Sequence, residues 1–138
     1  MDQILSRLYC GSLEDAQAWT YKDGQAIVTL SEQRIDKNAS PLLIHVAYLP
    51  IPDEAWLPRE IWKSRVDALA HYLGLHWTVL VHCRLGVSRS PALCAAYLAH
   101  TGWDLDEALA YVQSKRACTK VHGETWRGVK EWLCGNML

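Results

Sequence analysis

The sequence has 138 residues, half of them hydrophobic, and a formal net charge of −1. This length predicts one domain, residues 1–138, with a sizeable core, and the near-neutral charge argues against bulk attraction to nucleic acid or to an anionic membrane. The N-terminus lacks the basic and then apolar pattern of a signal peptide, and no apolar run approaches the roughly 20 residues of a spanning helix. We therefore expect a soluble cytoplasmic protein.

Short apolar runs alternate with turn signals along the chain. In chain order they predict a strand at 4–10, a helix from Ser12 to about Trp19, a strand at 26–30, a polar surface loop at 31–41, a strand at 42–49, a helix at 59–74, a strand at 77–81, a buried helix including 92–99, a helix capped near Asp104, and a last helix at 123–134. This order predicts an α/β fold: one domain with a central, mostly parallel sheet of four to five strands and helices on both faces.

The stretch Val79–Pro91 combines the features of an anion site. An apolar strand leads into Cys83, five residues follow, and Arg89 then stands at the start of a helix. The N–H groups of such a loop and the helix N-terminus favour an oxyanion. Gly86 permits a backbone conformation that other residues resist, and the guanidinium of Arg89 can hold two phosphate oxygens. Positive surroundings of this kind favour the thiolate form of a cysteine.

The residues around this loop resemble a known family. His82-Cys83-Arg84-Leu85-Gly86-Val87-Ser88-Arg89-Ser90 is similar to the signature of the cysteine-based protein tyrosine phosphatases, and its Ser-Arg-Ser-Pro ending looks like the dual-specificity branch. Residues 8–16 resemble the opening strand and first helix of that family, and residues 49–53 resemble its general-acid loop. The chain is thus identified as a member of the small, atypical dual-specificity phosphatases.

The resemblance implies a role for each residue of the loop. Cys83 would be the nucleophile that forms a phosphocysteine. His82 would orient the loop by hydrogen bonding. Ser90 would donate a hydrogen bond to the sulfur, although a simple helix cap is an alternative for this serine. The phosphate would be bound by Arg84, Leu85, Gly86, Val87, Ser88 and Arg89.

Two prolines flank Ile51 and stiffen the segment that presents Asp53. The resemblance makes Asp53 the general acid that protonates the leaving oxygen, with Glu54 as the second choice. An ordinary surface aspartate is the alternative, because aspartate is mostly exposed in proteins. No cofactor is implied, since loop donors supply the charge stabilisation.

The remaining titratable residues show no pattern of a metal site. The other five histidines lack zinc-type spacing, so no metal is predicted. The five cysteines form no Cys-x-x-Cys pair, which fits a reducing compartment. Cysteine is commonly buried, so the cysteines other than Cys83 are predicted to be packing residues, although one of them could be a thiol that protects an oxidised Cys83. They are Cys10, Cys94, Cys118 and Cys134.

The resulting hypothesis is hydrolysis of phosphotyrosine and of phosphoserine or phosphothreonine in proteins, by a monomer that binds neither nucleic acid nor membrane. Lipid or RNA phosphates, a non-catalytic phosphate-binding module and a sulfurtransferase are the alternatives. Apolar Leu85 and Val87 favour protein over polyphosphorylated lipid substrates. The basic residues Lys115, Arg116 and Lys120 are predicted to be a solvated face, or else to contact acidic residues around a phosphosite.

Overall fold

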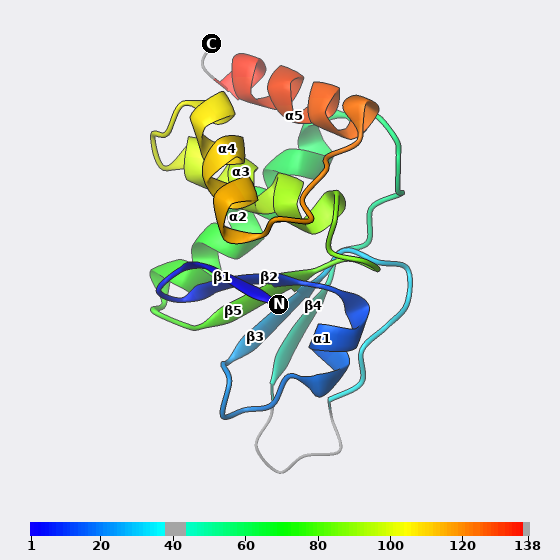
Figure 1. The fold of residues 1–138 in the computed structure, drawn as a ribbon, viewed down its shortest axis with the longest axis vertical. Coiled ribbons are helices and arrows are strands. Elements are labelled where there is room, and N and C mark those ends of the chain that lie inside the picture. The colour runs from blue at the N-terminus through cyan, green and yellow to red at the C-terminus, as the bar shows by residue number, and fades with distance from the viewer. Residues whose placement is uncertain (38–43, 137–138) are drawn as a thin grey trace.

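The computed structural model describes residues 1–37 and 44–136, and these contain one five-stranded sheet in the order β1-β2-β5-β3-β4 (Figure 1). The strands are β1 (Asp2–Leu5), β2 (Leu8–Gly11), β3 (Ala26–Thr29), β4 (His45–Tyr48) and β5 (Val79–His82). β1 runs antiparallel to β2, whereas every other pair is parallel. The predicted mostly parallel sheet is therefore confirmed.

Two of the predicted strands differ from the structure. The single strand expected at 4–10 is a hairpin of β1 and β2, because the exposed polar pair Ser6–Arg7 forms a tight turn. Gln3 Nε2 donates a hydrogen bond to Ser6 O at 3.2 Å and supports this turn. The strand expected at 42–49 is described only over 44–49, where β4 occupies the centre, and residues 38–41 of the predicted loop likewise lie outside the described residues.

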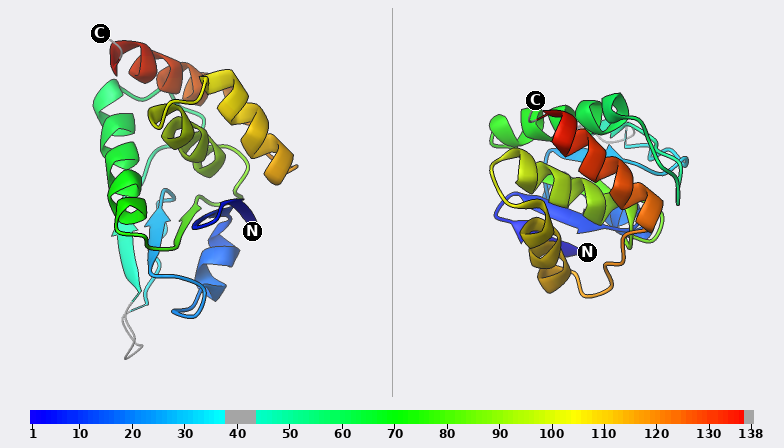
Figure 2. Two further views of the ribbon diagram at one scale, coloured as in Figure 1. Left: turned by 90° about the vertical axis from the view of Figure 1, so that its left-hand side faces the viewer. Right: turned by 90° about the horizontal axis from the view of Figure 1, so that it is seen from above.

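Helices cover both faces of the sheet, as predicted. α1 lies on one face, and the other four helices gather on the opposite face (Figures 1 and 2). The helices are α1 (Leu13–Ala18), α2 (Arg59–Gly74), α3 (Arg89–His100), α4 (Leu105–Lys115) and α5 (Gly123–Asn136). Among the described residues, none of these helices combines the length and the apolar character needed to cross a bilayer.

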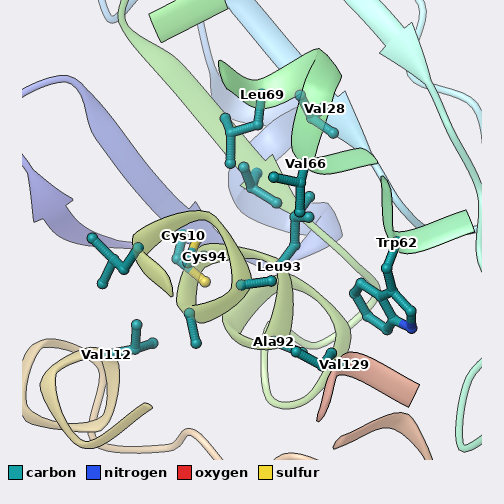
Figure 3. Packing of buried hydrophobic residues seen from close by; sticks show 14 of the residues in the cluster. Cys10, Val28, Trp62, Val66, Leu69, Ala92, Leu93, Cys94, Val112 and Val129 are labelled. Atoms are coloured by element: carbon teal, nitrogen blue, oxygen red, sulfur yellow. The ribbon is translucent and has the colours of Figure 1, made fainter. Parts of the chain in front are cut away.

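The alternation of side chains along β5 divides the core into two clusters. Val79 and Val81 pack in the large cluster under α2–α5, whereas Leu80 faces the small cluster under α1. α3 is the centre of the large cluster, since every residue of α3 except Tyr97 and His100 is buried. Figure 3 shows side chains of α2 and α3 meeting in this cluster, with the sulfurs of Cys10 and Cys94 beside one another.

The strand register brings the ends of four strands to one edge of the sheet. His82 pairs with Gly11 on one side and with Thr29 on the other, and Thr29 pairs with Tyr48. The loops that follow these strands therefore begin at the same level. This edge is where parallel α/β sheets place their ligands, and it is the edge that carries Cys83.

Candidate active site

Cys83 follows β5 directly and lies at the floor of a pocket of about 650 Å³. Its side chain is buried, and its residue is only 3% exposed. Two groups of Ser90 in the first turn of α3 contact the sulfur: the backbone N–H donates to Sγ at 3.4 Å, and Oγ lies 3.3 Å from Sγ. The nucleophile candidate thus stands at the N-terminus of a buried helix, the end that carries the partial positive charge of the helix dipole.

The loop at residues 84–88 turns all of its carbonyl groups outward. Arg84 O accepts from the N–H of Leu13, Leu85 O and Gly86 O from the guanidinium of Arg116, Val87 O from the N–H of Lys120, and Ser88 O from the N–H of Ala92. In a trans peptide the next N–H points away from the carbonyl, so the N–H groups of residues 85–89 face into the loop. None of these N–H groups has a partner within the described ranges.

Arg116 and Gly86 explain how the loop keeps this shape. Gly86 has φ +70°, and a Cβ at this position would lie 2.6 Å from Gly11 O, so only glycine fits. Arg116 is buried, donates from Nε to Gly86 O at 2.6 Å, and forms an ion pair with Asp2 at 2.8 Å. The prediction of a solvated basic face is therefore wrong for Arg116, although Lys115 and Lys120 are exposed.

Arg89 is buried and held in a fixed orientation beside the loop. Its Nη1 donates to Ile51 O at 3.0 Å, to Leu30 O at 3.4 Å and to Glu32 Oε1 at 3.3 Å. Its Nε lies 3.5 Å from Asp53 Oδ1. Nη2 has no protein partner in the part of the chain that the structure describes, and Arg89 lines the pocket. The free edge of the guanidinium is thus available to an oxyanion.

Asp53 reaches the pocket from the loop after β4. It is half-exposed, and its Oδ1 also accepts the N–H of Glu54 at 2.9 Å. Glu54 has φ +53°, a conformation that costs free energy in a residue with a side chain and is often found at functional sites. Both carboxylates line the same pocket as Cys83. The structure therefore brings the Asp53 loop and the loop after Cys83 to one pocket, although α2 and β5 separate them in the sequence.

Side-chain contacts with α2 and α5 hold this loop in place. Arg65 donates to Pro50 O at 2.8 Å, and Trp56 Nε1 donates to Glu131 Oε2 at 2.5 Å. Arg127 lies over the ring of the same tryptophan, 5.5 Å from its centroid. Trp56, Arg127 and Glu131 are exposed, so these contacts add a surface layer to the buried anchors of the loop, Ile51 and Leu57.

His82 lies buried behind the nucleophile. Nδ1 is 3.1 Å from Cys83 O, which can only accept, so Nδ1 carries the proton and Nε2 accepts from Thr29 Oγ1 at 2.9 Å. Burial, reinforced by the charge of Arg89, lowers the pKa of His82. The ring is therefore neutral at pH 7 and ties the carbonyl of Cys83 to β3.

Ser90 is not the cap of α3, because the N-cap position belongs to Ser88. Ser90 Oγ is buried and lies within hydrogen-bond distance of Cys83 Sγ, of Gly11 O at 3.2 Å and of Cys10 Sγ at 3.4 Å. This placement leaves its hydroxyl able to donate either to the Gly11 carbonyl or to the sulfur of Cys83.

The other cysteines divide into two groups. Cys10 and Cys94 are buried packing residues, as predicted, and their hydrogen bond together with burial raises the pKa of the Cys94 thiol. Cys118 and Cys134 are exposed, so the packing prediction is wrong for both. The reason is their position: Cys118 lies on the connection that covers the loop from outside, and Cys134 on the solvent side of α5.

Sequence reasoning missed two residues that contact the site. Glu32 forms the ion pair with Arg89, although its carboxylate is 71% exposed and its segment reads as an ordinary polar loop. For Arg116 the sequence pattern indicates a surface cluster, because nothing in its neighbours along the chain marks its distant carbonyl partners. The one sequence feature that indicates burial of Arg116 is its position at the end of α4: it follows the buried Val112 by one helical turn and so continues the apolar face of the helix.

Comparisons with known proteins assign the family. The model of the dual specificity phosphatase catalytic domain matches residues 56–133, just after Asp53. Human protein phosphatase Slingshot homolog 1 is 40% identical over 94% of this chain and 13% of its own length. Tyrosine-protein phosphatase yvh1 of Schizosaccharomyces pombe is 29% identical over 85% of this chain and 36% of its own length. The chain thus spans about a third or less of these relatives.

A solved structure agrees with the fold. Human DUSP28 superimposes with a TM-score of 0.85 at 22% identity, covering 99% of this chain and 98% of that one. With a family model that matches more than half of the sequence and a pocket built around Cys83 and Arg89, the chain belongs to the dual specificity phosphatase family of the protein tyrosine phosphatase superfamily.

Proposed function

We propose that this protein hydrolyses phosphate monoesters of tyrosine, serine and threonine in proteins through a phosphocysteine intermediate. The observation that carries the proposal is the loop at 84–88, whose outward carbonyls leave five N–H groups aimed at the space above Cys83. Such an array of donors neutralises a phosphoryl group held at the sulfur. Relatives whose names describe protein phosphatases support protein substrates.

In the first step, the Cys83 thiolate attacks phosphorus while the bond to the leaving oxygen breaks. The loop N–H groups and Arg89 Nη2 hold the three non-bridging oxygens, on which charge is concentrated in the transition state. Asp53 gives its proton to the leaving oxygen, which departs as the free tyrosine, serine or threonine hydroxyl. The phosphoryl group then rests on the sulfur.

In the second step, water attacks the phosphocysteine. Asp53, now ionised, takes a proton from that water, and the sulfur leaves as a thiolate. Ser90 supports the departure, because its backbone N–H already donates to Cys83 Sγ and its hydroxyl stands at 3.3 Å. Inorganic phosphate is released, and the enzyme returns to its starting state.

The test of the covalent step uses Cys83→Ser. Turnover of p-nitrophenyl phosphate is expected to vanish, whereas calorimetry should show inorganic phosphate still bound, since the loop donors do not depend on sulfur. Cys134→Ser, at an exposed cysteine on α5, is the matched control and should behave as wild type. Appreciable turnover by Cys83→Ser would exclude the phosphocysteine.

The substrate class needs a separate panel. Phosphotyrosine, phosphoserine and phosphothreonine peptides of matched sequence should all be hydrolysed, with a phosphoinositide and a 5′-phosphorylated RNA as comparison substrates. Strict phosphotyrosine selectivity would restrict the proposal to tyrosine phosphatase activity. Faster hydrolysis of the lipid or of the RNA would contradict the proposal of protein substrates.

A further inference from the structure

Two cations on the pocket wall have no ion-pair partner among residues 1–37 and 44–136. Arg84 and Lys120 are exposed and line the pocket, and neither forms an ion pair within the described residues. The position of Lys120 is fixed, because its backbone N–H donates to Val87 O at 2.8 Å. Lys115, by contrast, lies over the ring of Tyr111 and does not line the pocket. The pocket thus carries positive charge that the catalytic steps leave unused.

His122 adds a third donor to the same wall. Its backbone N–H donates to Ser88 Oγ at 3.0 Å, and its Nδ1 accepts the N–H of Glu124 at 3.3 Å. With Nδ1 occupied as an acceptor, the proton of the neutral ring is on Nε2. This nitrogen has no partner in residues 1–37 and 44–136, and His122 lines the pocket. Its N–H is therefore available to an anionic group.

The charge of the pocket is divided between its chain segments. The loop at residues 84–88, here called the phosphate loop, supplies Arg84, and the connection between α4 and α5 supplies Lys120 and His122. The loop after β4 supplies the carboxylates of Asp53 and Glu54. Leu85, at 69% exposure, adds an apolar surface at the mouth. The inositol ring of a polyphosphorylated lipid carries phosphates on several sides, and some of them would be repelled by these two carboxylates. An extended peptide can place its acidic side chains on the basic side alone.

Resting on the proposed function, we propose that Arg84, Lys120 and His122 form a subsite for acidic side chains next to the phosphorylated residue, which makes acidic phosphopeptides the favoured substrates. The subsite lies at the rim, so its contacts are solvent-screened, and each exposed pair contributes a small factor. Two or three such pairs together give about a fivefold preference in kcat/KM. The preference should decrease with salt, because the screening length shortens from about 10 Å at 0.1 M to 3 Å at 1 M.

The test compares two phosphotyrosine peptides that differ only in glutamate or glutamine at the positions flanking the phosphotyrosine. Wild type should favour the glutamate peptide about fivefold in kcat/KM. The double variant Arg84→Gln/Lys120→Gln should hydrolyse the two peptides within a factor of about two of each other. Lys115→Gln removes a nearby exposed lysine outside the pocket and should keep the full preference. Equal hydrolysis of both peptides by wild type would overturn the inference.

Binding measurements separate failure of this inference from failure of the proposed function. Calorimetry with Cys83→Ser reads the affinity for both peptides without turnover, and p-nitrophenyl phosphate reads turnover without flanking residues. Absent turnover with a retained binding preference would refute the phosphatase and keep the subsite. Normal turnover with equal peptide affinities would refute only the subsite. A short-chain phosphoinositide bound more tightly than the glutamate peptide would also overturn the choice of an acidic peptide.

Discussion

Replacing Arg116 with methionine tests whether the shape of the phosphate loop depends on the hydrogen bonds that Arg116 donates to its carbonyl groups. Methionine keeps most of the apolar stem and leaves the carbonyls of Leu85 and Gly86, as well as Asp2, without their cation. Hydrogen bonds from a charged donor contribute about 1.5–3 kcal/mol each. The Asp2 contact is worth less than about 1 kcal/mol, because that carboxylate is 42% exposed.

The hydrogen bond to Gly86 O is short, at 2.6 Å, whereas the bond to Leu85 O is long, at 3.3 Å, and therefore weak. Together these contacts predict a loss of about 3 kcal/mol in the free energy of unfolding. For a chain of this size the loss lowers Tm by about 10 °C. The freed carbonyls also cease to orient the following N–H groups. Loss of one such donor weakens phosphate binding about tenfold.

Two variants isolate the cause. Asp2→Asn removes only the exposed ion pair and should cost less than about 1 kcal/mol, and Lys115→Met alters the neighbouring exposed lysine and should leave both Tm and phosphate affinity unchanged. Urea unfolding and calorimetric titration with inorganic phosphate measure the two effects. An Arg116→Met protein that unfolds within about 0.5 kcal/mol of wild type and binds phosphate equally well would refute the reasoning.

Three further substitutions probe the site. Gly86→Ala is expected to abolish phosphate binding in calorimetry, because a Cβ cannot stand 2.6 Å from Gly11 O at φ +70°; binding within a factor of two of wild type would contradict this reading. Asp53→Asn should slow alkyl phosphate hydrolysis by about 10² or more and affect an ester of an acidic phenol much less; equal losses for both esters would make Asp53 a structural residue. Because the pKa of His82 is lowered in the fold, the unfolded chain binds its proton first, so stability falls as pH drops below about 6.5. The stability advantage of wild type over His82→Gln, measured in urea, should therefore shrink from pH 7.5 to 5.5, and a constant difference would refute the assignment.

Local patterns predicted the parts of the molecule whose determinants are local. The two prolines around Ile51, the glycine within the loop and the cap at Ser12 each act on their own backbone, and the structure has a capping box at Ser12 and a positive φ at Gly86. The apolar spacing of α2 likewise predicted which face is buried, because helical periodicity needs no partner to be read.

Long-range partners account for what the sequence did not reveal. Arg116 meets the Gly86 carbonyl 30 positions away, and Glu32 meets Arg89 57 positions away, and in both cases a charged residue on a polar segment reads as solvated. The hairpin of β1 and β2 was missed because two polar residues within an apolar run are compatible with either one strand or a turn. Cys118 and Cys134 show the opposite error to Arg116: the residue type predicts a buried side chain, but both cysteines are exposed because of their positions in the fold.

The central place of β5 has a consequence for the mobility of the site. β5 is bonded to β2 and β3 on its two sides and is fully buried, so its amide protons can exchange with solvent only when the whole sheet opens. Asp53 lies in the exposed stretch 52–54, between the buried anchors Ile51 and Leu57, and the amides of this stretch can exchange through small local openings. The nucleophile thus follows a strand of high local stability, whereas the acid is carried by an exposed stretch that small local openings can reach.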